Sequence, residues 1–408
     1  MKRLSADRVS GVLARLNDRP RVVVSGNFAT PHTLLNAVDK SLPQYVLHML
    51  NAQGELPSRD GVTYETTFVG PAMRRRPGLR YVPCRLSLVP VLFHRRLPPD
   101  LVLLHTSGPV NGMVSLGLEV NILPAAIEAA RRRGGLVIAQ VNPKMPYTFG
   151  DAELDVDDID YFVEVDEPLT THTAGEPDET ARLIGDRVAS HVPNGATMQL
   201  GIGAVPDAVL ADLTSHRDLR IWTEMFSDGV LALDEKNALS ATTPLTASFV
   251  FGSQELYDWV DQNPRVRMMR TEVTNDPARI AKQSIMTSVN GALQVDLSAQ
   301  ANASRINGKI YSGFGGSTDF IVGALHSRGG HAYIALPSWH PRADKSTIVP
   351  QIREPVTSFQ HSAVVTEQGM AAVFGNTEVE QTHQIIEKCA HPRARPELWE
   401  AAREMGRA

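Results

Sequence analysis

The sequence contains little cysteine and no long apolar run. Its 408 residues include only two cysteines, Cys84 and Cys389, at distant positions. Two isolated cysteines provide neither a disulfide framework nor a cysteine metal site, and this usage suits a reducing compartment. No stretch of 18 apolar residues occurs, and the N-terminal segment lacks the apolar core of a signal peptide. We therefore expect a cytoplasmic protein that neither spans a membrane nor follows the usual secretory route.

An excess of positive charge is also missing. The chain has 40 basic and 45 acidic residues, a formal net charge of −5, so we expect neither nucleic acid nor an anionic membrane as a partner. Two arginine clusters, 74–76 and 131–133, most simply form solvated surface, although either could meet a phosphorylated ligand. The length predicts two or three domains of ordinary globular composition.

The common catalytic and metal-binding motifs are absent. The chain has no Gly-x-Ser-x-Gly elbow, no phosphate-binding Gly-x4-Gly-Lys-Ser/Thr loop and no His-Glu-x2-His helix, and its histidines are scattered. The acidic run 155–160 lacks the glycine and the terminal glutamate of a calcium loop. Serine hydrolase, P-loop and zinc chemistry are thus poorly supported, and we predict no metal site.

The most informative stretch is 197–229, which we interpret as strand, glycine loop, helix, strand and then one glutamate. Gly201 and Gly203 lack a Cβ, so the backbone can turn sharply and approach a ligand closely. Pro206 suits a first helical position, where bare N–H groups can hold an anion or a developing oxyanion. Glu224 ends the next apolar run, the place where parallel α/β sheets bind ligands. We predict that Glu224 is the reactive residue.

The same turn occurs earlier in the chain. Gly26 precedes Pro31 by five residues, as Gly201 precedes Pro206, and each pair joins an apolar strand to a helix. This repeat, together with alternating strands and helices, predicts two similar open α/β domains with mainly parallel sheets. We place them at residues 1–190 and 191–408, with the linker in 169–179. In the second domain, Asn275 or Asp276 could equally be a helix N-cap or a functional residue.

Two chemical interpretations of Glu224 remain open from the residues alone. In one, Gly201-x-Gly203 is a dinucleotide fingerprint and Glu224 holds a ribose, although Pro206 occupies the place of the third small residue. In the other, Glu224 is a covalent nucleophile that attacks a thioester and forms an acyl-glutamyl anhydride. Each step of that chemistry passes through an oxyanion, which needs backbone N–H donors, and the glycine loops 201–203 and 313–316 could supply them.

The ordered set of motifs resembles the acetyl-CoA hydrolase/transferase family, which includes the 4-hydroxybutyrate and acetate CoA-transferases. The resemblance runs from about Val22 to Pro392. It is carried by Val141-Asn-Pro-Lys-Met-Pro-Tyr-Thr-Phe-Gly-Asp151, Asp158-Ile-Asp-Tyr-Phe-Val163, Gln199-Leu-Gly-Ile-Gly-Ala-Val-Pro-Asp-Ala-Val-Leu210, Thr223-Glu-Met-Phe-Ser-Asp-Gly229, Ser312-Gly-Phe-Gly-Gly316 and Val365-Thr-Glu-Gln-Gly369.

The resemblance implies an active site between the two domains and a role for several residues. It places the nucleophile on Glu224 and one oxyanion donor on the N–H near Ile202. The second donor falls on Gly315 or Gly316. Substrate-binding positions fall on the loop with Gln199, Gly201 and Gly203, and on two residues that would hold the acyl or carboxylate group, Asn275 and Glu367.

The resemblance also implies the substrates. We expect a CoA-transferase that moves coenzyme A between a small acyl-CoA, such as acetyl-CoA, and a carboxylic acid, with no permanently bound cofactor and as a homo-oligomer. The alternatives are an acyl-CoA hydrolase on the same fold, an NAD-dependent dehydrogenase and a non-catalytic CoA-binding protein. Two segments, 338–347 and 369–380, depart from the family pattern and leave the acceptor acid open.

Overall fold

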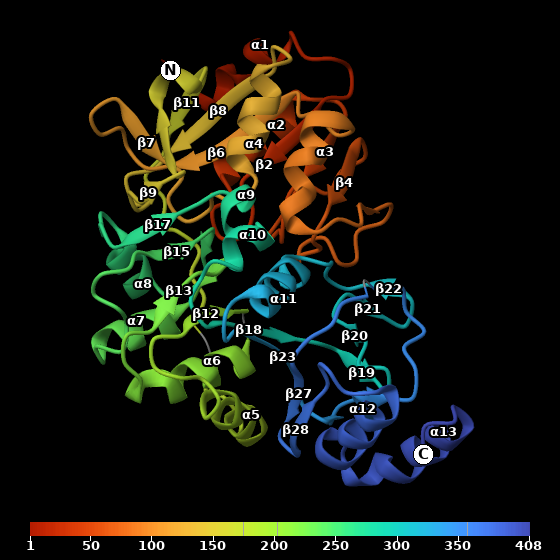
Figure 1. Cartoon of the computed structure of the whole chain (residues 1–408). Helices are drawn as coiled ribbons and strands as arrows, with labels where there is room; N and C mark the ends of the chain where they lie inside the picture. The colour runs from red at the N-terminus through yellow and green to blue at the C-terminus, as the bar shows by residue number, and fades with distance from the viewer. Residues whose placement is uncertain (174, 202, 357) are drawn as a thin grey trace. The chain divides into compact units, whose positions relative to one another are not determined.

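The computed structural model describes residues 1–408 except 174, 202 and 357 (Figure 1). The chain forms two compact units, each assembled from three segments. The N-terminal unit comprises Met1–His172, Leu245–Thr274 and Tyr311–Gly315, and the C-terminal unit comprises Thr173–Pro244, Asn275–Ile310 and Gly316–Ala408.

The N-terminal unit is built on an eight-stranded sheet in which every neighbouring pair runs parallel. In spatial order its strands are β1 (Lys2–Arg3), β11 (Tyr161–Glu164), β8 (Leu136–Val141), β6 (Leu101–Thr106), β2 (Arg21–Val24), β3 (Tyr45–His48), β4 (Val62–Thr66) and β5 (Arg80–Tyr81). The central strands β6 and β8 are buried along their whole length, as expected for a parallel sheet covered on both faces.

Helices complete the N-terminal unit. They are α1 (Val9–Leu13), α2 (His32–Ser41), α3 (Val89–Arg95), α4 (Leu123–Arg131), α8 (Gln254–Val260) and α9 (Thr271–Thr274). Helix α4 packs on β6 and β8, and its buried residues are mostly alanines, which let the helix approach the sheet closely. A small sheet, β15 (Leu245–Ala247), β17 (Val266–Met268) and β9 (Phe149–Gly150), joins the segment after residue 244 to the rest of this unit.

The C-terminal unit is built on a six-stranded sheet that is parallel except at one edge. Its spatial order is β13 (Arg220–Ile221), β12 (Thr197–Leu200), β18 (Met286–Gly291), β23 (His331–Ala335), β27 (Ala363–Thr366) and the antiparallel β28 (Gly369–Ala372). Helix α11 (Ser317–His326) packs on β18 and β23, while the pair α5 (Glu179–Ala189) and α6 (Ala204–Asp212) contacts β27 and β18 (Figure 1).

The remaining elements of this unit extend its apolar core. They are α7 (Asp228–Glu235), α10 (Pro277–Ile280), α12 (Glu378–Gln384), α13 (Arg395–Glu404), β19 (Gln294–Asp296), β20 (Ala301–Asn302) and β26 (Ile348–Val349), with short hairpins β21–β22 (Arg305–Ile306 and Lys309–Ile310) and β24–β25 (Trp339–His340 and Lys345–Ser346). One apolar cluster joins α11, β23 and β27 to the C-terminal helices through Phe320, Ile334, Val364, Ile385 and Leu398.

The two open, mainly parallel sheets confirm the predicted fold class, with local differences. Strand β4 begins at Val62 and ends at Thr66, so residues 67–69 lie beyond it. The apolar run 286–297 forms two strands, β18 and β19. In the described part of the chain, none of the helices combines the length and the apolar character needed to cross a bilayer.

Candidate active site

The predicted reactive residues gather at one edge of the six-stranded sheet. Gly201 follows β12, Glu224 lies three residues after β13, and Glu367 directly follows β27. Since these strands run parallel, their carboxyl ends share one edge, which is where open α/β sheets bind ligands. The strand topology therefore explains why residues distant in sequence occupy one region of the C-terminal unit.

Asn275 holds the Glu224 side chain, and Thr223 holds the turn that carries it. The Asn275 side-chain amide donates a hydrogen bond to Oε2 of Glu224 at 2.9 Å, and Asn275 is fully buried. Thr223 Oγ1 donates to the Leu200 carbonyl at 3.2 Å, which ties the Glu224 turn to the end of β12. Asp276, the next residue, caps α10 by accepting from the Ala278 N–H. The N-cap is thus Asp276, which leaves Asn275 to face the glutamate.

Gly316 lies directly against the Glu224 carboxylate. A Cβ at residue 316 would be 1.8 Å from Oε2 of Glu224 and 2.2 Å from Nδ2 of Asn275, so only glycine leaves room for both groups. Gly316 is also the N-cap of α11. The carboxylate therefore lies at the start of a ten-residue helix, where backbone N–H groups favour negative charge.

Burial dominates the electrostatics of this site. Burial is the main cause that raises the pKa of Glu224, the Asn275 hydrogen bond opposes it, and the charge of Asp319 in the first turn of α11 adds to it, so that the pKa is about 7. A carboxylate that loses water and gains little neutral hydrogen bonding in return is a stronger nucleophile than one in solvent. At neutral pH Glu224 is present in both protonation states.

The glycine loop 201–203 leads into α6, which begins at Ala204 with Gly203 as its N-cap. Gly203 has a φ of +119°, a conformation that requires glycine. A Cβ at Gly201 would meet nothing nearer than Pro206 Cγ at 4.0 Å, so that glycine leaves open space beside the loop. Pro206 is the third helical residue and not the first, because the helix starts two residues earlier than predicted. Ile202, the predicted oxyanion donor, lies outside the described residues.

Gln199 is engaged within the sheet. Its Oε1 accepts from Ser288 Oγ at 2.6 Å and from Asn290 Nδ2 at 3.1 Å, both on the neighbouring strand β18. All three side chains are buried. The amide cluster fixes the carboxyl ends of β12 and β18 relative to each other, and a substrate-binding role for Gln199 stays a prediction.

Glu367 is held by a different set of donors. Its carboxylate accepts from the Ser338 backbone N–H at 2.8 Å, from Ser338 Oγ and from Gln368 Nε2 at 3.1 Å. Arg187 of α5 donates to the Glu367 backbone carbonyl at 3.1 Å. The side chain is partly buried. Its predicted role toward substrate stays a prediction.

Gly315 belongs to the N-terminal unit and Gly316 to the C-terminal unit. Gly315 has a φ of +58° and its backbone lies against the Phe68 ring, which a Cβ would approach to 3.1 Å. Its carbonyl accepts from the Leu86 N–H. Of the two candidates for the second oxyanion donor, Gly316 is the one whose contact with Glu224 the structure describes.

Sequence reasoning missed two residues of this region. Asp319 acts on the pKa of Glu224 although it lies far from it in sequence, and its only signal was an acid shortly after the glycine loop 313–316. Ser338 was seen only as part of an atypical segment, yet both its hydroxyl and its N–H bind Glu367. Among the described residues, no group of three or more His, Cys, Asp or Glu side chains is arranged to hold a metal ion.

Comparison with known proteins adds to this geometry. The chain is 36% identical over 410 residues to the 4-hydroxybutyrate coenzyme A transferase of Clostridium kluyveri, covering 95% of this chain and 94% of that protein. Residues 252–402 match the sequence profile of the acetyl-CoA hydrolase/transferase C-terminal domain. The chain belongs to the acetyl-CoA hydrolase/transferase family.

Solved structures agree with this assignment. The 4-hydroxybutyrate CoA-transferase of Porphyromonas gingivalis superposes with a TM-score of 0.84 at 30% identity, covering 99% of this chain and 98% of that one. RipA from Yersinia pestis superposes with a TM-score of 0.91 at 26% identity, covering 100% and 98%. Family members with the other activity are also similar to this chain: the acetyl-CoA hydrolase of Kluyveromyces lactis is 34% identical over 208 residues, or 49% of this chain and 39% of that protein.

Proposed function

We propose that this family member is a CoA-transferase that moves coenzyme A between a small acyl-CoA, such as acetyl-CoA, and a carboxylic acid, with Glu224 as the covalent nucleophile. The observation that supports it most is the pairing of Glu224 with Gly316 and Asn275: a desolvated carboxylate, held by one amide, beside a glycine that no larger residue could replace. A carboxylate with only a packing or ribose-binding role needs neither a raised pKa nor a glycine beside it that leaves its oxygen atoms uncovered.

The chemistry requires four nucleophilic attacks at three carbonyl carbons: one on the first acyl group, two on the Glu224 carboxyl carbon and one on the acceptor acid. The ionised Glu224 attacks the acyl-CoA carbonyl, forming an acyl-glutamyl anhydride and releasing the coenzyme A thiolate. The thiolate attacks the glutamyl carbonyl, which expels the first acid and leaves an enzyme thioester. The acceptor carboxylate then attacks that thioester, and the released thiolate attacks the acceptor carbonyl of the new anhydride. The second acyl-CoA leaves and Glu224 is regenerated as a carboxylate.

The neighbouring groups suit these steps. Each tetrahedral intermediate carries an oxyanion, and removal of one N–H donor to such an oxyanion typically costs about 10²–10³-fold in rate. We assign one donor to the N–H near Ile202 and the other to Gly316 in preference to Gly315. Asn275 orients the glutamate and can hold the acyl group, and Glu367 would hold the acceptor side through its Ser338 anchor.

The proposal includes the cellular setting. Coenzyme A is a substrate here and not a resident cofactor, and we propose a cytoplasmic homo-oligomer. Because one relative is a 4-hydroxybutyrate coenzyme A transferase, 4-hydroxybutyrate is the first acceptor to test, with acetate, propionate and succinate beside it.

The deciding experiment incubates the protein with acetyl-CoA and each carboxylate in turn and identifies new acyl-CoA species by mass spectrometry. We expect transfer to at least one acid and no transfer by the Glu224→Gln variant, which keeps the size of the side chain but is a far poorer nucleophile. Acetyl-CoA that disappears without a new thioester would instead support the hydrolase activity named in relatives.

Trapping identifies the nucleophile itself. Borohydride reduces an enzyme thioester but not a free carboxylate, so treatment with acyl-CoA and then borohydride should modify one glutamate. Peptide mass mapping should place the change within residues 221–229. An adduct at Glu367 would show that the nucleophile is wrongly assigned, and turnover retained by Glu224→Gln without any adduct would exclude the covalent mechanism.

A further inference from the structure

The two arginine clusters of the N-terminal unit differ in what surrounds them. The pocket beside cluster 131–133 contains three arginines, Arg131, Arg132 and Arg270, and also four acids, Glu128, Asp151, Glu153 and Asp158. Arg131 pairs with Asp160 at 2.9 Å and Arg270 with Glu128 at 2.6 Å. The positive charge of this pocket is therefore compensated, and it offers little attraction for an anion.

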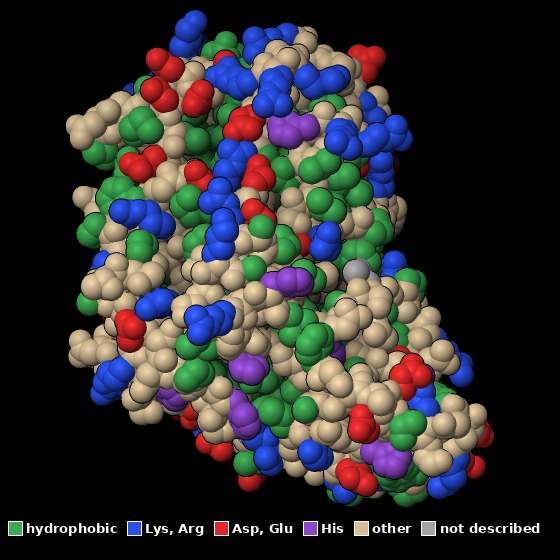
Figure 2. Space-filling model, viewed as in Figure 1, with side chains coloured by type: hydrophobic (Ala, Val, Ile, Leu, Met, Phe, Trp, Pro, Cys, Tyr) green, Lys and Arg blue, Asp and Glu red, His purple; other side chains and the backbone are tan. Residues whose placement is uncertain are grey.

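The pocket beside cluster 74–76 has no such compensation. It has a volume of about 550 Å³, within the usual range for small-molecule sites. The residues that line it are Pro71, Ala72, Arg74, Arg75, Arg76 and Pro77, so its lining includes three arginines and no acidic residue. On the face of the molecule in Figure 2, by contrast, basic and acidic side chains are mixed.

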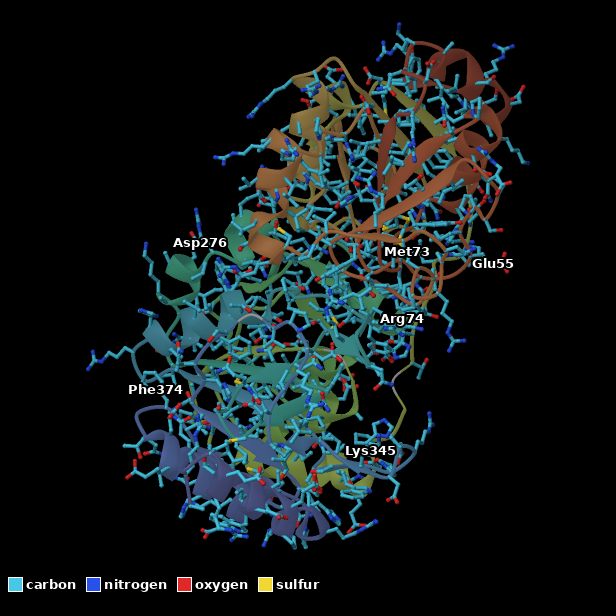
Figure 3. The ribbon with its side chains drawn as sticks, turned by 90° about the vertical axis from the view of Figure 1, so that its right-hand side faces the viewer. Glu55, Met73, Arg74, Asp276, Lys345 and Phe374 are labelled. Carbon is cyan, nitrogen blue, oxygen red and sulfur yellow. The ribbon has the colours of Figure 1, made fainter. Side chains whose placement is uncertain are left out.

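The turn that presents these arginines is firmly seated. Met73, at its centre, is fully buried, and the Ala72 N–H donates to the Ala52 carbonyl at 3.1 Å. Gly70 lies so close to Asn51 and Ala52 that a Cβ there would be 2.3 Å from the Asn51 carbonyl carbon. Pro71 and Pro77 flank the turn and fix φ on both sides. Figure 3 labels Met73 and Arg74 at this turn.

Neutral groups hold two of the three guanidinium groups. Arg74 donates through Nε to the Tyr311 carbonyl at 3.0 Å and lies 4.0 Å from the centre of the Tyr311 ring. Arg76 donates through Nε to the Ala72 carbonyl at 3.1 Å and lies 5.3 Å from the centre of the Tyr64 ring. Aromatic rings and carbonyls orient a guanidinium without cancelling its charge. Arg75 is exposed and makes no hydrogen bond or ion pair with the described residues.

We propose that the turn 71–77 is a binding site for a phosphate monoester on a nucleotide. The Nη1 and Nη2 groups of Arg74 carry N–H donors that no described contact uses, and such donors form paired, charge-assisted bonds with phosphate oxygens. The exposed side chain of Arg75 supplies the third positive charge, beside those of Arg74 and Arg76. Two ligands carry such a phosphate. One is coenzyme A, at its nucleotide end, and this assignment rests on the proposed function. The other is a separate nucleotide.

The test measures binding directly, without turnover. Adenosine 3′,5′-bisphosphate, which matches the phosphorylated end of coenzyme A, should bind in calorimetry with an affinity that falls as salt rises. Arg74→Ala and Arg75→Ala should each weaken that binding at least tenfold. Arg132→Ala removes the same charge from an arginine that is exposed, as Arg75 is, beside the compensated pocket and should leave binding within twofold of wild type.

Two further arms separate the sources and keep this site distinct from the catalytic proposal. If the ligand is coenzyme A, Arg75→Ala raises the KM for acetyl-CoA tenfold and leaves the KM for acetyl-pantetheine unchanged. If the ligand is a separate nucleotide, Arg75→Ala leaves both KM values unchanged while binding of the bisphosphate is lost. Glu224→Gln should bind the bisphosphate normally even if Glu224 proves not to be the nucleophile. No saturable binding, or equal loss in Arg132→Ala, would overturn the site.

Discussion

At the scale of single residues, the raised pKa of Glu224 affects both the rate of the reaction and the stability of the folded protein. The attacking group must be ionised, and burial together with the charge of Asp319 raises the pKa of Glu224 to about 7. We expect kcat/KM for acetyl-CoA to rise with pH and level off above an apparent pKa near 7. Asp319→Asn removes the charge that raises the pKa, so its profile should shift to lower pH. A profile already flat from pH 5 upward would contradict this assignment.

The same pKa predicts a pH-dependent stability effect. The folded pKa of about 7 lies above the ordinary value of 4.5, so between these pH values the folded state holds a proton that the unfolded chain has released. Stability from this group therefore falls as pH rises from 4.5 to 7 and stays low above. At about 1.4 kcal/mol for each pH unit, the cost at pH 8 is about 3 kcal/mol.

Glu224→Gln should consequently be more stable than wild type at pH 8 and closer to it at pH 5. Thermal unfolding at both pH values measures this, with Glu367→Gln as the control, since it makes the same carboxylate-to-amide change at a side chain that Ser338 holds by hydrogen bonds. Equal midpoints for Glu224→Gln and wild type at pH 8 would show that the carboxylate is better solvated than its burial indicates.

At the scale of elements, the start of α11 matters most. Gly316→Ala would place a Cβ 1.8 Å from the Glu224 carboxylate, which forces the nucleophile to move. A displacement of about an ångström can cost about 10²-fold in rate, so turnover should fall by at least that factor while the protein still folds. Gly291→Ala, at the end of β18 on the same sheet edge, meets only the Ala335 carbonyl at 3.9 Å and is the matched control.

Circular dichroism and steady-state kinetics on both variants check this prediction. Gly291→Ala should keep near-normal activity. If Gly316→Ala also remained active, the loop before α11 would not belong to the reaction.

The elements also show where sequence patterns suffice. The apolar runs 136–141 and 363–366 predict their strands because buried parallel strands need continuous apolar side chains. Pro206 misled, because proline tolerates any position of the first helical turn, where its missing N–H is not needed. The repeated Gly–Pro spacing likewise conceals a difference: Pro31 is the N-cap of α2, whereas Gly203 caps α6.

At the scale of the whole molecule, the cofactor class can be tested. A thioester site in the loop 201–206 has no use for a dinucleotide, so we expect no saturable binding of NAD(H) or NADP(H) at millimolar concentration by calorimetry. Binding of NAD(H) or NADP(H) at micromolar concentration, abolished in Glu224→Ala, would instead show that Glu224 binds the ribose of a dinucleotide.

Composition and strand–helix alternation predicted the fold class, and the ordered motifs predicted the family. The pairing of Glu224 with Asn275 could not be derived from spacing, because the two residues meet only through the order in which β12, β13 and β18 lie in the sheet. The assembly of each compact unit from three segments was equally invisible, since contacts between distant segments leave no periodic signal.

Because each compact unit is assembled from three segments of the chain, the gene cannot be divided between the units by one cut. A fragment of residues 1–190 would lack Leu245–Thr274, and with it β15 and β17, the other two strands of the β9 sheet. A fragment of residues 191–408 would lack α5, which packs against α6. Neither piece can close its own core, so co-expressed halves should recover activity only by folding around each other. A break within 306–309, by contrast, would cut the exposed turn of the hairpin β21–β22 and is the better place to split the polypeptide.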